Sequence, residues 1–325
     1  MTSEAAHRLV KTNGINMHIA EQGTGPLVLL CHGFPEIWRC WRHQLPALAD
    51  AGFRAVAPDL RGYGRTDAPE EIESYTILHL VGDLVGLVEA LGERRAVVVG
   101  HDWGASLAWM AALIRPDIFM AVAAMSVPLR SRGPVAPLSA WRAAGLENFY
   151  YFYFQKPGVA EAEFAPDVSG ALRRGLYTLS GDAPATMEWS PMLTPGGGFT
   201  DKMIDPPSLP AWLTENDIEA AASEFRRTGF RGGLNWYRNI DRNWALTAAF
   251  HGLQISQPAL FIAGTRDITI AGPGKAALDQ LTAAVPGLKR QLLIEGAGHW
   301  IGEERPNEVN AALIDFLSEF APRPR

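Results

Sequence analysis

The sequence predicts an α/β protein with a mostly parallel central sheet, flanking helices and an inserted helical segment. Short, nearly continuous apolar runs such as residues 96–100 alternate with stretches of helical period. Strands that are apolar throughout are typical of parallel sheets covered on both faces. From Arg130 to about Trp244 this alternation stops, and helix-like pieces separated by Pro- and Gly-rich loops replace it.

Each core element is predicted from its own period and boundaries. Residues 77–91, for example, place apolar side chains along one broad helical face, and Gly92 ends the helix. The expected strands are residues 17–21, 27–31, 53–58, 96–100, 121–125, 258–263 and 291–294. The expected helices are residues 37–49, 77–91, 105–114, 273–284 and 306–320, the last with Pro306 in its first turn.

We therefore divide the chain into a core of residues 1–130 plus 245–325 and a helical cap domain of residues 131–244. The cap follows the strand at 121–125, which we count as the sixth of the sheet. Five of the seven tyrosines lie in this segment, at positions 150, 151, 153, 177 and 237. We expect it to cover the carboxyl ends of the strands, where open α/β sheets bind ligands.

Composition excludes several classes of function. The 325 residues carry a net charge of −6 and no basic run that would bind nucleic acid. No secretory leader and no membrane-length apolar stretch is visible, and the two cysteines suggest no disulfide framework, so we expect a cytoplasmic protein that is not bound to a membrane. No His or Cys spacing indicates a metal site, and Gly62-Tyr63-Gly64 is not a dinucleotide fingerprint.

The residues Gly100-His101-Asp102-Trp103-Gly104 follow an apolar run and precede a helical pattern. A strand, a glycine-flanked turn and a helix form a nucleophile elbow, whose central side chain projects above the sheet. Here it is Asp102, and a carboxylate attacks a saturated electrophilic carbon to give an alkyl ester that water cleaves. This favours opening an epoxide or displacing a halide over acyl transfer. An aspartate that only caps the next helix is the alternative.

Such a nucleophile needs a carboxylate and a histidine base, in the order nucleophile, acid, histidine. Asp267 follows the strand at 258–263, and His299 follows the strand at 291–294 in a Gly-rich loop. Both therefore lie at the same sheet edge as Asp102. The alternatives are a turn residue for Asp267 and a surface or core histidine for His299. The loop after 121–125, Ser126-Val127-Pro128, contains no carboxylate.

The segment His32-Gly33-Phe34-Pro35 directly follows the strand at 27–31. The tetrahedral intermediate of ester cleavage needs two backbone N–H groups that point at its oxyanion. We expect one from Trp103 and the other from Phe34, with Pro35 a candidate for a cis bond. We interpret His32 and His101 as structural residues.

With these motifs the chain resembles the soluble epoxide hydrolases of the α/β-hydrolase superfamily over nearly its whole length. The oxyanion loop 32–36 and the elbow 100–104 are shared with dehalogenases, whereas segments 153–161 and 230–239 are more specific, although Lys156 stands where the family often has an acid. The resemblance implies two cap tyrosines that polarise or protonate the epoxide oxygen. They match Tyr150 and Tyr237, with Tyr151 and Tyr153 left as alternatives to Tyr150.

The resemblance implies a reaction without cofactor or metal. Asp102 would form a hydroxyalkyl ester, and His299, oriented by Asp267, would activate the water that releases a vicinal diol. The reactants would be a small hydrophobic epoxide and water. The expected pocket residues are Phe34, Trp103, Trp236 and Trp300. Detoxification and biosynthesis both stay open as roles, and a homodimer is one option for the oligomeric state.

Two alternatives remain at this stage. A haloalkane or haloacid dehalogenase would share the Asp-Asp-His triad, although position 34 is Phe and position 103 is Trp, where such enzymes use other residues. A non-catalytic receptor for a hydrophobic ligand would not need the triad and the oxyanion loop together.

Overall fold

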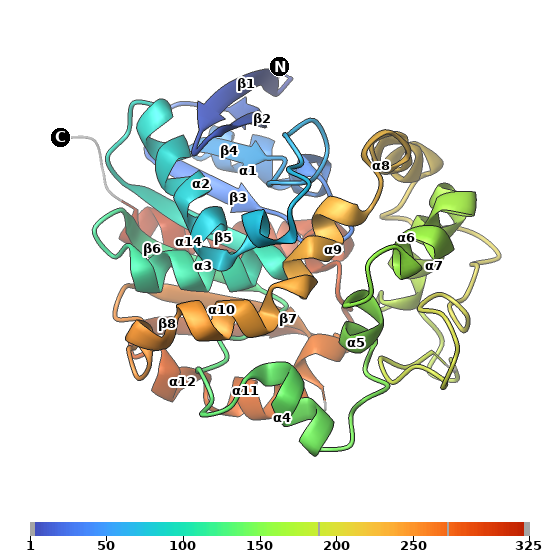
Figure 1. Cartoon of the computed structure of the whole chain (residues 1–325). Coiled ribbons are helices and arrows are strands. Elements are labelled where there is room, and N and C mark those ends of the chain that lie inside the picture. Colours follow the sequence, from blue (N-terminus) through green and yellow to red (C-terminus); the bar gives the residue numbers. More distant parts are fainter. Residues whose placement is uncertain (1–3, 188, 272, 322–325) are drawn as a thin grey trace.

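The computed structural model describes residues 4–187, 189–271 and 273–321. An eight-stranded sheet crosses its centre in the order β1-β2-β4-β3-β5-β6-β7-β8 (Figure 1). The pairs β1–β2 and β2–β4 are antiparallel, and all other neighbours are parallel. The strands are β1 (Ala6–Thr12), β2 (Ile15–Gln22), β3 (Leu27–Cys31), β4 (Arg54–Pro58), β5 (Ala96–His101), β6 (Phe119–Met125), β7 (Ala259–Gly264) and β8 (Leu288–Ile294).

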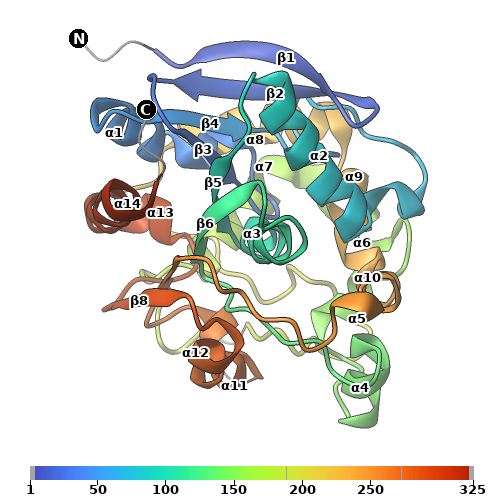
Figure 2. The same cartoon turned by 90° about the vertical axis from the view of Figure 1, so that its left-hand side faces the viewer.

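Alternate residues of the central strands enter two cores on opposite faces of the sheet. In β3, Leu29 and Cys31 join one core and Val28 and Leu30 join the other. Figure 2 shows α2 (Ile77–Ala90) and α3 (Trp103–Ile114) on one face, and α1 (Gln44–Asp50) and α14 (Pro306–Phe320) on the other. Burial on both faces explains the nearly continuous apolar strands and confirms the predicted α/β class.

Three core elements differ from the prediction. No sequence pattern predicted β1, because it is an edge strand and most of its side chains are exposed. With β1 counted as the first strand, β6 is the sixth strand of the chain. The helix expected at 37–49 is instead a 3₁₀ turn, η1 (Trp38–Trp41), followed by α1. Pro46 lacks an N–H and is tolerated only in a first helical turn, so α1 begins at Gln44.

A third difference concerns the helix expected at 273–284. It is divided into α11 (Pro273–Asp279) and α12 (Leu281–Ala284), with Gln280 between them. The chain then continues to α13 (Ile301–Glu304) and α14, whose bounds agree with the prediction. The other 3₁₀ turns are η2 (Ile72–Tyr75), η3 (Ala165–Asp167), η4 (Ala248–Phe250) and η5 (Ile268–Ile270).

Between β6 and β7 the chain forms helices, and Figure 1 shows α5 to α8 gathered to the right of the sheet. The helices are α4 (Pro137–Ala143), α5 (Tyr150–Phe154), α6 (Val159–Phe164), α7 (Val168–Thr178), α8 (Glu215–Thr228), α9 (Arg231–Arg238) and α10 (Ile240–Leu246). The domain boundaries at 131 and 244 stay a prediction. Within the described ranges, no helix has both the length and the apolar character to cross a bilayer.

Candidate active site

Asp102 lies in the turn between β5 and α3, with φ 52° and ψ −117°. This strained backbone requires small neighbours. A Cβ at Gly104 would lie 2.0 Å from the carbonyl oxygen of Cys31, and one at Gly33 would lie 2.4 Å from the Asp102 side chain. The Asp102 side chain accepts no capping hydrogen bond from the α3 amides that follow Trp103. The alternative of a simple helix cap is therefore wrong.

The Asp102 carboxylate occupies two different environments. Its Oδ1 accepts a hydrogen bond of 2.9 Å from the Phe34 amide, and the Trp103 amide also bonds to the carboxylate. Its Oδ2 lies 3.7 Å from Nε2 of His299. Burial raises the pKa of Asp102, and the opposing effects of His299, His101 and the two amides do not cancel that rise. The Phe34–Pro35 bond is cis.

His299 lies beside Asp102, and Asp267 lies behind His299. Nδ1 of His299 is 3.1 Å from Oδ1 of Asp267, which also accepts hydrogen bonds from the amide and hydroxyl of Thr269. Burial lowers the pKa of His299, but the Asp267 carboxylate outweighs it and the net shift is upward. Burial by itself raises the pKa of Asp267, but His299 and the hydrogen bonds from Thr269 and Ser126 together lower it by more, so the net shift is downward and the carboxyl is ionised. The structure thus brings the three predicted triad residues together.

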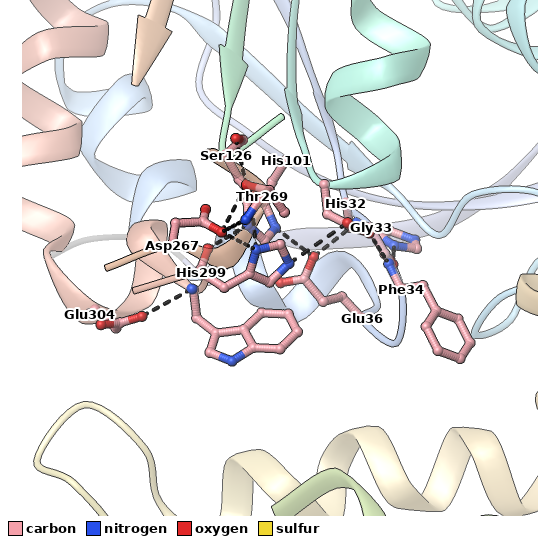
Figure 3. A network of polar contacts seen from close by, with 12 residues as sticks. His32, Gly33, Phe34, Glu36, His101, Ser126, Asp267, Thr269, His299 and Glu304 are labelled. Atoms are coloured by element: carbon pink, nitrogen blue, oxygen red, sulfur yellow. Dashed lines mark hydrogen bonds and ion pairs between the residues drawn. The ribbon is translucent and has the colours of Figure 1, made fainter. Parts of the chain in front are cut away.

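Ser126 contacts His299, and the sequence analysis did not predict this contact. Its Oγ lies 2.9 Å from Nδ1 of His299 and 3.0 Å from Oγ1 of Thr269. Figure 3 shows Ser126, Thr269 and Asp267 gathered around the same part of the His299 ring. In sequence, Ser126 stood out only as a position without a carboxylate.

A buried ion pair lies behind the nucleophile. Nδ1 of His101 is 2.9 Å from Oε2 of Glu36, and the same oxygen accepts the Gly33 amide. Nε2 of His101 donates to the carbonyl oxygen of His299 over 2.7 Å. Burial opposes both charges, yet the Coulomb attraction raises the pKa of His101 to about 9 and lowers that of Glu36 to about 2. His101 is therefore a buried cation. The sequence analysis interpreted it as a structural residue and did not predict its charge.

His32 has the structural role that the sequence suggested, because both of its ring nitrogens form hydrogen bonds with backbone groups. Its Nδ1 donates to the carbonyl oxygen of Gly33, and its Nε2 accepts the Leu60 amide. Burial lowers the pKa of His32 and favours this neutral form. The two contacts fix the start of the oxyanion loop.

Two tyrosines from the inserted helices line a cavity together with Asp102 and His299. Tyr150 begins α5 and Tyr237 lies in α9, with ring centroids 6.2 Å apart. Burial raises the pKa of each phenol well above 10, so both keep their protons. Tyr151 lines a neighbouring cavity instead, and Tyr153 contacts Glu163. Position alone therefore favours Tyr150 over its two alternatives.

Close packing of α9 on the core places Tyr237. A Cβ at Gly232 would lie 2.2 Å from the carbonyl oxygen of Gly62, so only glycine allows this approach. The indole N–H of Trp236 donates to the carbonyl oxygen of Arg61 over 3.1 Å. The side chain of Gln155 donates to the carbonyl oxygen of Tyr237 and so connects α9 to the end of α5.

The cavity beside Asp102 corrects the predicted set of pocket residues. Phe34 and Trp300 line it as expected, together with apolar side chains such as Leu172. Trp236 and the Trp103 side chain do not. Trp236 is buried against the core through its indole hydrogen bond, and Trp103 lines a separate cavity.

The loop that carries His299 is fixed by the inserted segment, through a glutamate that the sequence did not single out. Glu304 accepts three backbone amides, those of Gly181, Gly298 and Trp300. The His299 amide donates to the carbonyl oxygen of Leu179 over 2.9 Å. The sequence signal that could have identified Glu304 is an acidic residue within a buried stretch, because a buried carboxylate requires a partner.

Comparison with known proteins agrees with this geometry. Residues 26–306 match the model of a family described as alpha/beta hydrolase fold. The chain is 49% identical over 317 residues to epoxide hydrolase A of Mycobacterium tuberculosis, covering 96% of this chain and 97% of that relative. It is 46% identical over 319 residues to epoxide hydrolase 3 of Siraitia grosvenorii, covering 97% of this chain and 98% of that relative.

Solved structures show the same likeness. A crystal structure of epoxide hydrolase A from Mycobacterium thermoresistibile matches with a TM-score of 0.92 and 47% identity, covering 98% of this chain and 100% of that one. An epoxide hydrolase from an endophytic Streptomyces matches with a TM-score of 0.93 and 49% identity, covering 97% of this chain and 96% of that one.

Proposed function

This chain belongs to the alpha/beta hydrolase fold family and is an epoxide hydrolase, and on that premise we propose that it works through a covalent ester on Asp102. The observation that carries the proposal is that the two oxygens of the Asp102 carboxylate have different neighbours. Oδ1 is held by the Phe34 amide, whereas Oδ2 lies toward His299, beside the cavity that the two tyrosines line.

In the first step, a lone pair of Asp102 Oδ2 attacks one epoxide carbon and the carbon–oxygen bond of the ring breaks. The leaving oxygen stays on the substrate and develops negative charge. Tyr150 and Tyr237 polarise it, and one of them supplies its proton. Burial keeps both phenols protonated at neutral pH, so each can donate.

In the second step, His299 Nε2 takes a proton from water, and the hydroxide attacks the ester carbon of Asp102. Charge then develops on Oδ1, which already accepts the Phe34 amide, and the Trp103 amide is the second donor we assign to the oxyanion. The bond from that carbon to Oδ2 breaks, and Oδ2 takes the proton of the added hydroxyl group, so the diol leaves with Oδ2 as its new hydroxyl oxygen and Asp102 is again a carboxylate. The proton on His299 returns through the site to the tyrosine, which restores the enzyme.

Electrostatics support the order of the two steps. The negative charge of Asp102 helps to raise the pKa of His299 in the free enzyme. Alkylation removes that charge, so the pKa of His299 falls once the ester has formed. His299 is therefore most available as a neutral base in the intermediate that needs it.

We also propose that residues 131–244 act as a cap over this site, because α5 and α9 supply the two tyrosines. The apolar lining supports a small hydrophobic epoxide as substrate, with water as the second reactant. The free thiols of Cys31 and Cys40 support a cytoplasmic location. The dehalogenase and receptor alternatives are set aside because the relatives are epoxide hydrolases.

A single turnover in water enriched in oxygen-18 tests the ester. Excess enzyme reacts with styrene oxide, and the diol and the peptide that contains Asp102 are weighed by mass spectrometry. We expect an unlabelled diol in the first turnover and the label on Asp102, and Asp102→Asn should abolish turnover. A labelled first-turnover diol would mean direct attack by water and would overturn the proposal.

A further inference from the structure

We propose that Ser126 is a positioning residue for His299, which holds Nδ1 from the end of β6 so that the neutral imidazole carries its proton on Nδ1 and keeps the lone pair of Nε2 directed at Asp102. The inference deepens the proposed function and rests on it, since it concerns the base of the second step. Ser126 itself touches neither Asp102 nor the substrate cavity in the contacts of the described residues.

The backbone of Ser126 is fixed on both sides. Its amide donates to the carbonyl oxygen of Ile262 in β7 over 2.8 Å, and its carbonyl oxygen lies 2.8 Å from Oγ1 of Thr269. From this fixed backbone, Oγ approaches Nδ1 of His299 to 2.9 Å, closer than the 3.1 Å of Asp267. Two different strand ends, those of β6 and β7, thus meet at one nitrogen atom.

The Asp267 oxygen nearest Nδ1 has little remaining capacity to accept a hydrogen bond from Nδ1. Oδ1 already accepts the amide of Thr269 at 2.9 Å and its hydroxyl lies at 2.8 Å, while Oδ2 has no hydrogen-bond partner among the described residues. His299 therefore shares one crowded oxygen. Ser126 Oγ supplies a second acceptor for the same proton, from a different direction, which restrains rotation of the ring.

The hydroxyl protons can be assigned consistently. If Nδ1 of His299 carries its proton between Asp267 and Ser126, the Ser126 hydroxyl donates to Oγ1 of Thr269. The Thr269 hydroxyl then donates to the carbonyl oxygen of Ser126 or to Asp267. Every proton has an acceptor, and Nε2 keeps the lone pair that a general base requires.

The backbone conformation gives independent support. In the described chain, three non-glycine residues have positive φ: Asn13, Asp102 and Ser126, the last at 73°. Such a conformation is strained in a residue with a side chain, and strained residues cluster at functional sites. A glycine would avoid that strain but would lose the hydroxyl at Nδ1. Two of the three strained residues therefore lie on the two sides of the His299 ring.

The test compares Ser126→Ala with Ser126→Gly. Both remove the hydroxyl, but glycine also relieves the positive φ, so an effect common to both variants belongs to the hydroxyl. The matched control is Thr12→Ala, which removes a buried hydroxyl that donates to the carbonyl oxygen of Asp83 far from the site. Rapid-mixing fluorescence with styrene oxide measures ester formation and ester hydrolysis separately, from pH 5 to about 9.

In both Ser126 variants we expect ester formation to stay within about twofold and hydrolysis to slow by about tenfold, the effect of one net hydrogen bond. The ester then accumulates. A hydroxyl acceptor stabilises the imidazolium more than the imidazole, so its loss lowers the pKa of His299 and moves the acid limb of hydrolysis to lower pH. Thr12→Ala should change neither the ratio of the two rates nor the pH profile.

Hydrolysis at the wild-type rate in both Ser126 variants would overturn the proposal, as would an equal fall of both steps with an unmoved pH profile, which marks general damage to the fold. Failure of the proposed function gives a different result. In that case the wild-type enzyme itself forms no ester, and the first-turnover diol carries oxygen-18.

Discussion

Replacing Glu36 by glutamine removes the anionic partner of His101 while keeping the shape of the side chain. In the wild-type protein the pKa of His101 rises from 6.5 to about 9, and that of Glu36 falls from 4.5 to about 2. Each pKa therefore changes by about 2.5, so the folded protein favours each charged form by a net amount of roughly 3 kcal/mol, at about 1.4 kcal/mol for one pKa unit, even after the opposing effect of burial. The two partners report the same interaction, so it is counted once.

The sign of each shift defines the pH window. Because the pKa of His101 is higher in the folded state, its contribution to stability is complete below pH 6.5 and is lost as pH rises through about 9. Because the pKa of Glu36 is lower in the folded state, its contribution is complete above pH 4.5 and is lost as pH falls toward about 2. The pair therefore stabilises the fold most between these limits.

We expect Glu36→Gln to lower the free energy of unfolding at pH 6 by about 3–5 kcal/mol, since it leaves a buried charge without its partner. The difference between the two proteins should shrink by roughly 3 kcal/mol by pH 10, as the wild-type His101 loses its proton. Urea unfolding at several pH values measures both quantities. Parallel pH curves for the two proteins would refute the assignment of a charged His101.

Four further outcomes follow from the site. His299→Gln should slow ester hydrolysis by about 10²–10⁴ and leave an enzyme whose intact mass is raised by one substrate, and an unmodified mass during turnover would contradict the base assignment. Tyr237→Phe should slow ester formation by about 10² while hydrolysis of the ester changes little, which rapid mixing resolves. Gly33→Ala places a Cβ 2.4 Å from the side chain of Asp102, so turnover should be lost while circular dichroism stays unchanged, and an active variant would show that the loop can retreat. Glu304→Ala leaves three buried amides without their acceptor and should destabilise the protein by about 3 kcal/mol or more in thermal unfolding, whereas an unchanged melting temperature would mean that water replaces the carboxylate.

The central elements could be predicted because their environment is uniform. A strand such as β3 is buried on both faces, so its five residues are all apolar and its bounds agree with the prediction. β1 lies at the sheet edge and exposes most of its side chains, which removes the signal. The break before α1 depends on Pro46, a local effect that the apolar period of residues 37–49 concealed.

The sequence by itself determined the kind of chemistry. An aspartate at the centre of a glycine-flanked turn, followed by an acid and a histidine after later strands, is a local pattern, and parallel topology brings the ends of such strands to one edge. For that reason Asp102, Asp267 and His299 could be predicted from the sequence alone. Their separate roles stay predictions that the labelling and trapping experiments address.

Only the tertiary structure decided which side chains serve that chemistry from a distance. Ser126 is 173 residues from His299 in sequence, and Glu36 is 65 residues from His101, so no periodicity or spacing connects them. The same holds for Trp236, whose indole N–H donates to the carbonyl oxygen of Arg61 instead of the ring lining the cavity. Hydrogen-bond partners depend on where two segments pack within a few ångströms, and that position is a property of the folded chain as a whole.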